Sequence, residues 1–309
     1  MRLVLLGNFS TPHSTEQHHR QALEDLGHDV VCLQEGKATA GQVVSQARGS
    51  SFLVWVHTHG FKTPGGIVSA LRELKRHGTP TIAYHLDLWM GLDREKDLTE
   101  GHPYLSDVSH FFTVDSRMAD WLNSHTGVRG HYLTAAVAHR ECYAWDGERD
   151  IPVAFVGSHH YHAAWPYRNE LIARLADRYG DDFHLIPGRG PAVRGADLNR
   201  LYSRTQVVVG DTLCPGFDYP DYWSDRVYET LGRGGFLIHP RITGMRDQFV
   251  DGVHLRYYDY NDWDSLFGIV DYYLANPEHR EEIRATGHAE VHAYHTYIHR
   301  WKTILETLR

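Results

Sequence analysis

Short apolar runs and amphipathic stretches alternate along the first half of the chain. The apolar runs at residues 2–9 (RLVLLGNF) and 51–60 (SFLVWVHTHG) are typical of buried strands, whereas residues 16–26 carry apolar side chains at helical spacing. The same patterns predict further strands at 28–35, 80–89, 110–116 and 128–136, and helices at 66–77 and 117–124. Strands that alternate with helices at this spacing predict a parallel sheet covered on both faces.

A stretch rich in charge, with glycine and proline, interrupts this pattern at residues 141–152, and we interpret it as a linker. A second alternating series follows, with strands at 151–158, 183–191, 205–212 and 236–240 and helices at 167–179 and 196–202. A closing helix has an apolar stripe made of Tyr294, Tyr297, Ile298, Trp301 and Ile304. Because 309 residues is the size of two ordinary domains, we predict domains at 1–148 and 149–290 and a closing helix at 291–309.

The composition is that of a globular protein in water, with 42% hydrophobic and 23% charged residues. The sequence has no apolar run of the length that a membrane span needs, and its first residues lack the pattern of a signal peptide. Cys32, Cys142 and Cys214 are far apart and form no CxxC pair, which fits a reducing compartment. We therefore expect a cytoplasmic protein.

Net charge and histidine content bear on the partners of the protein. The formal net charge is −8 and neither half is basic, so a large polyanion is not the first partner we expect. The 24 histidines are spread through every segment rather than gathered with acidic or thiolate co-ligands at metal-binding spacing. We expect no functional metal and no cofactor.

Polar residues follow the predicted strands of the first half, where ligands bind to parallel sheets. They include Gly7, Asn8 and Ser10 after the first strand, His57 and His59 after the third, and Asp87 after the fourth. Each of them alone is typical of a cap or a loop, but together they outline one cleft. If that cleft holds an acceptor, Asp87, His57 or His59 can take the proton of an attacking hydroxyl, and the sequence does not choose among them. The first turn lacks the GxGxxG and GK[ST] patterns, which argues against a dehydrogenase or a phosphate-loop enzyme.

Residues 221–240 (DYWSDRVYETLGRGGFLIHP) predict a helix that meets a buried strand through glycines. Ser224 and Asp225 can cap the first turn, where free NH groups attract an anion, and Arg226 adds a charge suited to a diphosphate. Glu229 follows one turn later, where a carboxylate can accept both hydroxyls of a ribose. The alternative is an ordinary capped helix with a surface glutamate and a glycine turn.

This stretch resembles the donor-binding segment of GT-B glycosyltransferases. More narrowly, the order of Arg226, Glu229 and the GGF sequence at 234–236 is similar to the spore-maturation (CgeB-like) group and to family 4-like glycosyltransferases. The motifs at 243–254 (TGMRDQFVDGVH), 273–287 (YLANPEHREEIRATG) and 295–305 (HTYIHRWKTIL) extend the resemblance over about residues 150–309.

The resemblance implies two Rossmann-like domains, a cleft between them and a last helix that crosses back onto the first domain. It assigns ribose binding to Glu229 and places Asp221, a shorter carboxylate, where the family has a glutamate near the sugar. It implies that the turn of Gly157 and Ser158, the loop of Arg189, and the backbone of Gly244 and Met245 meet the donor.

The function implied is transfer of a sugar from a nucleoside diphosphate sugar to a hydroxyl on a small molecule or glycan, without a metal. Two alternatives stay open. One is glycosylation of a modified base in DNA, against which the net charge argues. The other is a nucleotide-sugar or glycan binder without catalysis, which Asp221 favours, whereas Arg226 and Glu229 favour an enzyme.

Overall fold

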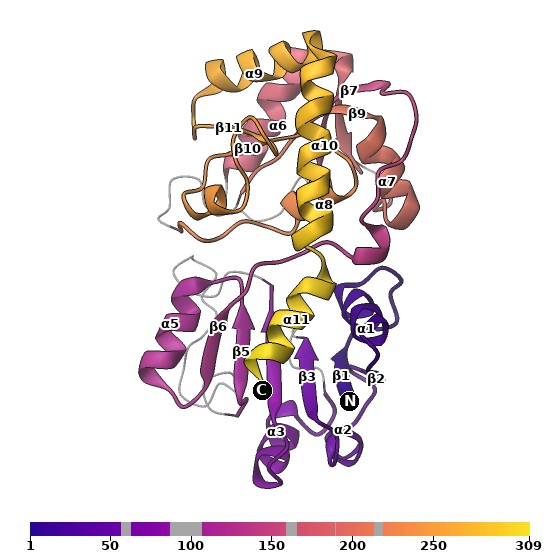
Figure 1. Ribbon diagram of the computed structural model, residues 1–309, viewed down its shortest axis with the longest axis vertical. Helices are drawn as coiled ribbons and strands as arrows, with labels where there is room; N and C mark the ends of the chain where they lie inside the picture. Colours follow the sequence, from indigo (N-terminus) through magenta and orange to yellow (C-terminus); the bar gives the residue numbers. More distant parts are fainter. Residues whose placement is uncertain (57–62, 87–106, 159–165, 189, 213–218) are drawn as a thin grey trace. The chain divides into compact units, whose positions relative to one another are not determined.

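The computed structural model describes residues 1–56, 63–86, 107–158, 166–188, 190–212 and 219–309. The chain divides into two compact units (Figure 1). The first unit comprises Met1–Thr134 together with Arg300–Arg309, and the second comprises Ala135–His299. His57, His59, Asp87 and Arg189, which the sequence singled out, lie outside the described residues.

The first unit is built on a parallel sheet with the strand order β2-β1-β3-β4-β5-β6. The strands are β1 (Arg2–Gly7), β2 (Asp29–Gln34), β3 (Phe52–Val56), β4 (Thr81–His85), β5 (His110–Thr113) and β6 (Arg129–Tyr132). Each pair of neighbours runs in the same direction, so every strand ends at the same edge. This confirms the sheet that alternating strands and helices predict.

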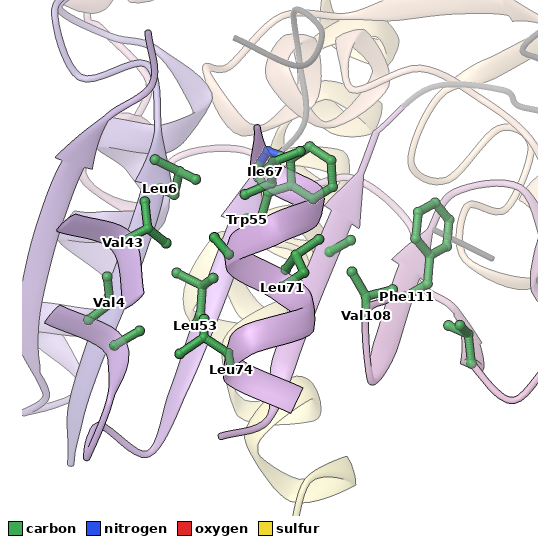
Figure 2. Packing of buried hydrophobic residues seen from close by; sticks show 14 of the residues in the cluster. Val4, Leu6, Val43, Leu53, Trp55, Ile67, Leu71, Leu74, Val108 and Phe111 are labelled. Atoms are coloured by element: carbon green, nitrogen blue, oxygen red, sulfur yellow. The ribbon is translucent and has the colours of Figure 1, made fainter. Parts of the chain in front are cut away.

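Helices cover both faces of this sheet: α1 (Thr15–Asp25), α2 (Ala40–Ala47), α3 (Ile67–Arg76), α5 (Ser116–His125) and the part of α11 (Tyr297–Thr307) that starts at Arg300. Figure 2 shows side chains of α3, among them Leu71 and Leu74, packed toward Leu53 of β3. The sequence did not predict α2, which is only two turns long. A capping box stabilises it, in which Thr39 and Gln42 each bond to the backbone of the other.

The opposite face of the first sheet is closed by α1 and by α11. Trp301 is fully buried, and its Nε1 donates a hydrogen bond to Nδ1 of His19 at 3.1 Å. The His19 ring lies 4.9 Å from that of Tyr84 on β4. Burial, together with the neighbouring His18, lowers the pKa of His19 to about 3, so this histidine is neutral in the folded protein.

The second unit repeats the architecture on a sheet with the order β11-β10-β9-β7-β8, and all of its strands are parallel. Its strands are β7 (Ile151–Val156), β8 (Phe183–Ile186), β9 (Thr205–Val209), β10 (Leu237–Pro240) and β11 (Arg256–Tyr258). Its helices are α6 (Pro166–Tyr179), α7 (Gly195–Arg204), α8 (Arg226–Gly232), α9 (Trp263–Ala275) and α10 (Pro277–Tyr294), with 3-10 turns η1 (His139–Glu141), η2 (Gly180–Asp182) and η3 (Gly244–Asp247). One core packs β7, β9 and β10 against α6 and α9.

Residues 141–145, which the sequence places in a linker, are fixed inside the second unit. Nδ2 of Asn199 donates to the carbonyl oxygens of Glu141 at 2.8 Å and Tyr143 at 2.6 Å, and the amide of Trp145 donates to Ser203 Oγ at 2.8 Å. Because these bonds hold the segment against α7, the division between the units falls at Thr134, ahead of the stretch of charge and proline.

The end of the chain differs from the expected single stripe. Tyr294 is 61% exposed at the end of α10, and His295 has a non-helical backbone, so α11 starts anew at Tyr297. Tyr297, Trp301 and Ile304 are buried as predicted. Across the described parts of the chain, the helices lack a stretch both apolar and long enough to pass through a bilayer.

Candidate functional site

The polar residues of the second unit gather at the carboxyl edge of its sheet. Gly157 and Ser158 follow β7, and Asp211 follows β9 two residues after Val209. The two strands are parallel neighbours with Ala154 opposite Val208, so their ends lie side by side. This edge of a parallel sheet is where ligands bind.

Asp211 is the centre of a cluster with two arginines. Its side chain is 1% exposed, and it accepts hydrogen bonds from Arg168 Nε at 2.5 Å and Arg168 Nη2 at 3.2 Å. Arg226 Nη1 donates to the same carboxylate at 2.9 Å. One buried carboxylate therefore accepts hydrogen bonds from two guanidinium groups at this sheet edge.

The two arginines differ in what they offer to a ligand. The side chain of Arg168 is 8% exposed, whereas that of Arg226 is 21% exposed. The Cζ atom of each lies 5.6 Å from the ring centroid of Phe155, a distance suited to a cation–π contact. Arg168 is buried because its guanidinium bonds to the buried carboxylate of Asp211, 43 positions away.

Gly157 lies against the guanidinium of Arg226. Its φ is +156°, which side-chain-bearing residues rarely adopt, and a Cβ there would lie 2.7 Å from Nη2 of Arg226. The Gly157 amide donates to the Ile186 carbonyl at 2.8 Å, and the Ser158 carbonyl accepts from Arg168 Nη1 at 3.1 Å. Within the described residues, this turn therefore supports the arginines of the cluster.

The start of α8 differs from the expected capped helix. Asp225 has a helical backbone and its side chain makes no capping bond, while Ser224 Oγ has no hydrogen-bond partner among the described residues. The helix is seven residues long. The predicted cap is wrong because the chain enters α8 already in helical geometry, so charge at this site comes from Arg226 rather than from a capped first turn.

Glu229 lies one turn after Arg226 and is held by Arg233 at the end of the same helix. Nε of Arg233 donates to Oε2 of Glu229, and Nη2 donates to Oε2 of Glu141. The side chain of Arg233 is 2% exposed, and that of Glu229 is 18% exposed. The sequence did not single out Arg233 or Glu141, since nothing in the local pattern links residues 92 positions apart.

Asp221 and Gly244 come together although 23 positions separate them in the sequence. A Cβ on Gly244 would lie 2.4 Å from Asp221 Oδ1, and the Gly244 amide donates to the carbonyl of Pro220 at 2.7 Å. That amide is thus engaged within the protein. Met245 is fully buried, so its side chain belongs to the core.

The residues predicted on the acceptor side organise one loop of the first unit. Asn8 Oδ1 accepts from Ser10 Oγ at 2.8 Å and from the Ser10 amide at 3.3 Å, so Asn8 and Ser10 form a local turn. A Cβ on Gly7 would lie 2.5 Å from Cγ of the buried Glu16. The three residues share the end of β1, as expected.

Taken together, the sheet edge offers the partly exposed guanidinium of Arg226 and the carboxylate of Glu229 one helical turn away. Such a pair matches a ligand with an anionic group next to a pair of hydroxyls, because guanidinium recognises phosphate and a carboxylate accepts hydroxyl protons.

Two α/β units with parallel sheets define the GT-B fold, and solved structures confirm it over the whole chain. HepE from Anabaena in complex with UDP-glucose has a TM-score of 0.66 at 12% identity, with 100% of this chain and 99% of that chain covered. T4 phage BGT in complex with its UDP-glucose substrate has a TM-score of 0.65 at 12% identity and the same coverage, 100% and 99%. An α-glucosyltransferase in complex with UDP-glucose and DNA containing an abasic site has a TM-score of 0.64 at 10% identity, again covering 100% and 99%.

The sequence profile of the family described as Glycosyl transferase-like matches residues 143–306, more than half of the chain. The protein therefore belongs to this glycosyl transferase-like family. The narrower CgeB-like group stays a prediction. No curated protein is similar enough in sequence to count as a relative.

Proposed function

We propose that the protein is a glycosyltransferase that moves a sugar from a nucleoside diphosphate sugar to a hydroxyl group of an acceptor. The observation that carries this proposal is that the guanidinium groups of Arg168 and Arg226 both bond to the buried carboxylate of Asp211. These cations lie at the edge of the second sheet where ligands bind to parallel sheets, and Arg226 is one helical turn from Glu229.

In this reaction the bond between the sugar carbon and the diphosphate oxygen breaks, and negative charge develops on the departing diphosphate. Arg226, the more exposed of the two arginines, is suited to stabilise that charge. Asp211 holds its guanidinium in place before the donor arrives. Since the positive charge comes from side chains, we expect turnover to survive a metal chelator.

Uridine is the first base to test, because HepE and T4 phage BGT were each solved with UDP-glucose. At 12% identity they support the fold, and the base specificity of this chain is our proposal.

For the acceptor we favour a small molecule or a glycan over DNA. The α-glucosyltransferase of the same fold was solved with DNA, but this chain has a formal net charge of −8. A protein that neutralises several phosphates binds DNA more weakly as salt rises. Tight, salt-sensitive binding to duplex DNA would overturn this preference.

The test is a calorimetric titration of UDP, GDP, ADP and dTDP and of their glucose conjugates into the wild type and into Arg226→Gln. We expect one nucleotide to bind the wild type and the variant to bind it about 10 to 100 times more weakly, the effect of losing a charged hydrogen bond. Arg174→Gln is the matched control, because Arg174 pairs with Glu170 on the same unit with both side chains close to half exposed.

Two outcomes count against the proposal. Failure of every nucleotide to bind at millimolar concentration overturns it. Binding without release of nucleotide in the presence of any acceptor, and without slow hydrolysis of the sugar conjugate, identifies a binder instead of an enzyme.

A further inference from the structure

Arg233 is buried at the end of α8 and makes four hydrogen bonds through its guanidinium. Nε donates to Glu229 and Nη2 donates to Glu141, while Nη1 donates to the side-chain oxygen of Asn199 and to the Gly195 carbonyl, the last at 3.2 Å. These partners come from α8, η1 and α7, so the planar guanidinium is fixed from three sides.

Asn199 determines the direction in which Arg233 points. It is fully buried, and its Nδ2 donates to the carbonyl oxygens of Glu141 at 2.8 Å and Tyr143 at 2.6 Å. Those bonds consume the amide nitrogen, which leaves Oδ1 to face Arg233. The orientation of the guanidinium is therefore set by the backbone of η1 and the residues after it.

The neighbouring carboxylates keep the Arg233 guanidinium positively charged. Burial by itself lowers the pKa of the Arg233 guanidinium, but the Glu229 and Glu141 carboxylates outweigh it and raise the pKa above its ordinary value. A permanent cation next to a carboxylate favours its charged form, and a charge-assisted bond is about twice as strong as a neutral one.

The two carboxylates on Arg233 differ in location. Glu141 belongs to a segment bound to α7, whereas Glu229 lies one turn after Arg226, on the helix that carries the proposed phosphate contact. The Glu229 side chain is 18% exposed, so part of it reaches solvent although Oε2 is bonded to Arg233.

We propose that Arg233 is a positioning residue, which holds the Glu229 carboxylate in one orientation so that it accepts the hydroxyls of a donor ribose. The inference rests on the proposed function, because it takes the ligand to be a nucleoside diphosphate. It adds a consequence for the donor class: the site discriminates ribonucleotides from 2′-deoxyribonucleotides, and Arg233, without touching the ligand, controls that discrimination.

The experiment measures the dissociation constants of UDP and of 2′-deoxy-UDP by calorimetry for the wild type, Arg233→Met, Glu229→Gln and Glu141→Gln. If UDP is not the nucleotide that binds, the ribo and deoxyribo forms of the one that does replace this pair. We expect the wild type to prefer the ribonucleotide by about 10 to 100 times, since a charged acceptor loses a hydroxyl donor in the deoxy form. In Arg233→Met and Glu229→Gln the preference should fall to within about 2-fold, with the affinity for the deoxynucleotide little changed.

Glu141→Gln is the matched control, because it removes the other carboxylate of the same buried arginine. It should lower stability yet keep the wild-type preference for the ribonucleotide. A purely structural role for Arg233 predicts that Arg233→Met weakens both nucleotides equally, which leaves their ratio unchanged and overturns the proposal.

Further outcomes separate this inference from the proposed function. If Arg233→Met does not fold, Arg233→Lys replaces it: an ammonium cannot reach both carboxylates and Asn199 in a fork, so the preference should fall below about a third of the wild-type value. If Arg233→Lys keeps the wild-type preference for the ribonucleotide, the inference is overturned, while the proposal that the protein binds a nucleotide stands. Failure of the wild type to bind any nucleotide removes the proposed function, and the inference with it.

Discussion

Gly157 and Arg226 are in contact because residue 157 has no side chain. A Cβ built on Gly157 would lie 2.7 Å from Nη2 and 2.9 Å from Cζ of Arg226. The guanidinium cannot simply swing aside, because Nη1 is bonded to the buried carboxylate of Asp211 at 2.9 Å. The glycine after β7 thus makes room for the cation that we propose meets the donor diphosphate.

Gly157→Ala should therefore displace Arg226 and weaken nucleotide binding by about 10-fold or more, which corresponds to about 1.4 kcal/mol. The φ of +156° adds backbone strain to the contact. Calorimetry with the responding nucleotide measures the effect. Gly268→Ala is the control, because Gly268 lies in α9 and a Cβ added there would have no atom within 4 Å. Wild-type affinity in Gly157→Ala would show that the position of Arg226 is unimportant.

Asp211→Asn should destabilise the second unit, because it removes the buried negative charge that accepts hydrogen bonds from Arg168 and Arg226. Removing one partner of a buried ion pair costs about 3–5 kcal/mol. Urea denaturation gives the free energy of unfolding. Asp271→Asn, which breaks an Arg178 pair with side chains 52% and 43% exposed, should leave the free energy of unfolding nearly unchanged.

The same Asp211→Asn variant offers a second readout of the charge at the site. Inorganic phosphate should raise the melting temperature of the variant more than that of the wild type, because an anion bound next to the arginines supplies the negative charge that the variant lacks. Equal responses in the two proteins would mean that the arginines are not accessible to an anion.

Gly244→Ala should disturb the contact between η3 and the segment before α8. The added Cβ would lie 2.4 Å from Asp221 Oδ1 and 2.8 Å from the Pro220 carbonyl, and a backbone atom cannot rotate away. We expect a loss of about 1–3 kcal/mol in the free energy of unfolding, as for other overpacked sites. Gly41→Ala in α2, where nothing lies within 4 Å, is the control. A Gly244→Ala protein as stable as the wild type would contradict this packing.

His19 should make the stability of the first unit fall with acidity. Burial and the neighbouring His18 lower its pKa from 6.5 to about 3 in the folded protein. At a pH between these two pKa values, the unfolded chain binds a proton at His19 that the folded chain does not. The free energy of unfolding therefore drops by up to about 1.4 kcal/mol for each unit by which the pH falls.

His19→Gln should remove this dependence of stability on pH, because glutamine does not titrate. The amide oxygen of the new glutamine can still accept the hydrogen bond from Trp301 Nε1. Urea denaturation at several values between about pH 7 and about pH 4 measures the slope for both proteins. Parallel stability curves for the wild type and the variant would mean that His19 is not the group responsible.

The sequence determined the class of fold, because strands and helices are local patterns. Alternation of apolar strands with amphipathic helices was enough to predict two parallel sheets, and both are present. The turn after β7 and the helix of Arg226 and Glu229 were also recognised, since their glycines and charges lie close together in the sequence. The two-turn helix α2 was missed because eight residues carry too little periodic signal.

The tertiary structure alone decided how the charges of the site are paired. Arg168 and Arg226 approach Asp211 from 43 and 15 positions away, and Arg233 reaches Glu141 from 92 positions away. An ion pair forms between whichever groups the sheet edge and the helix ends bring together, and it leaves no periodic trace in the sequence. The absent cap at α8 has a similar cause, since packing sets the direction in which the chain enters the helix. Local pattern thus specified the elements, and their packing selected which of the charged residues act together.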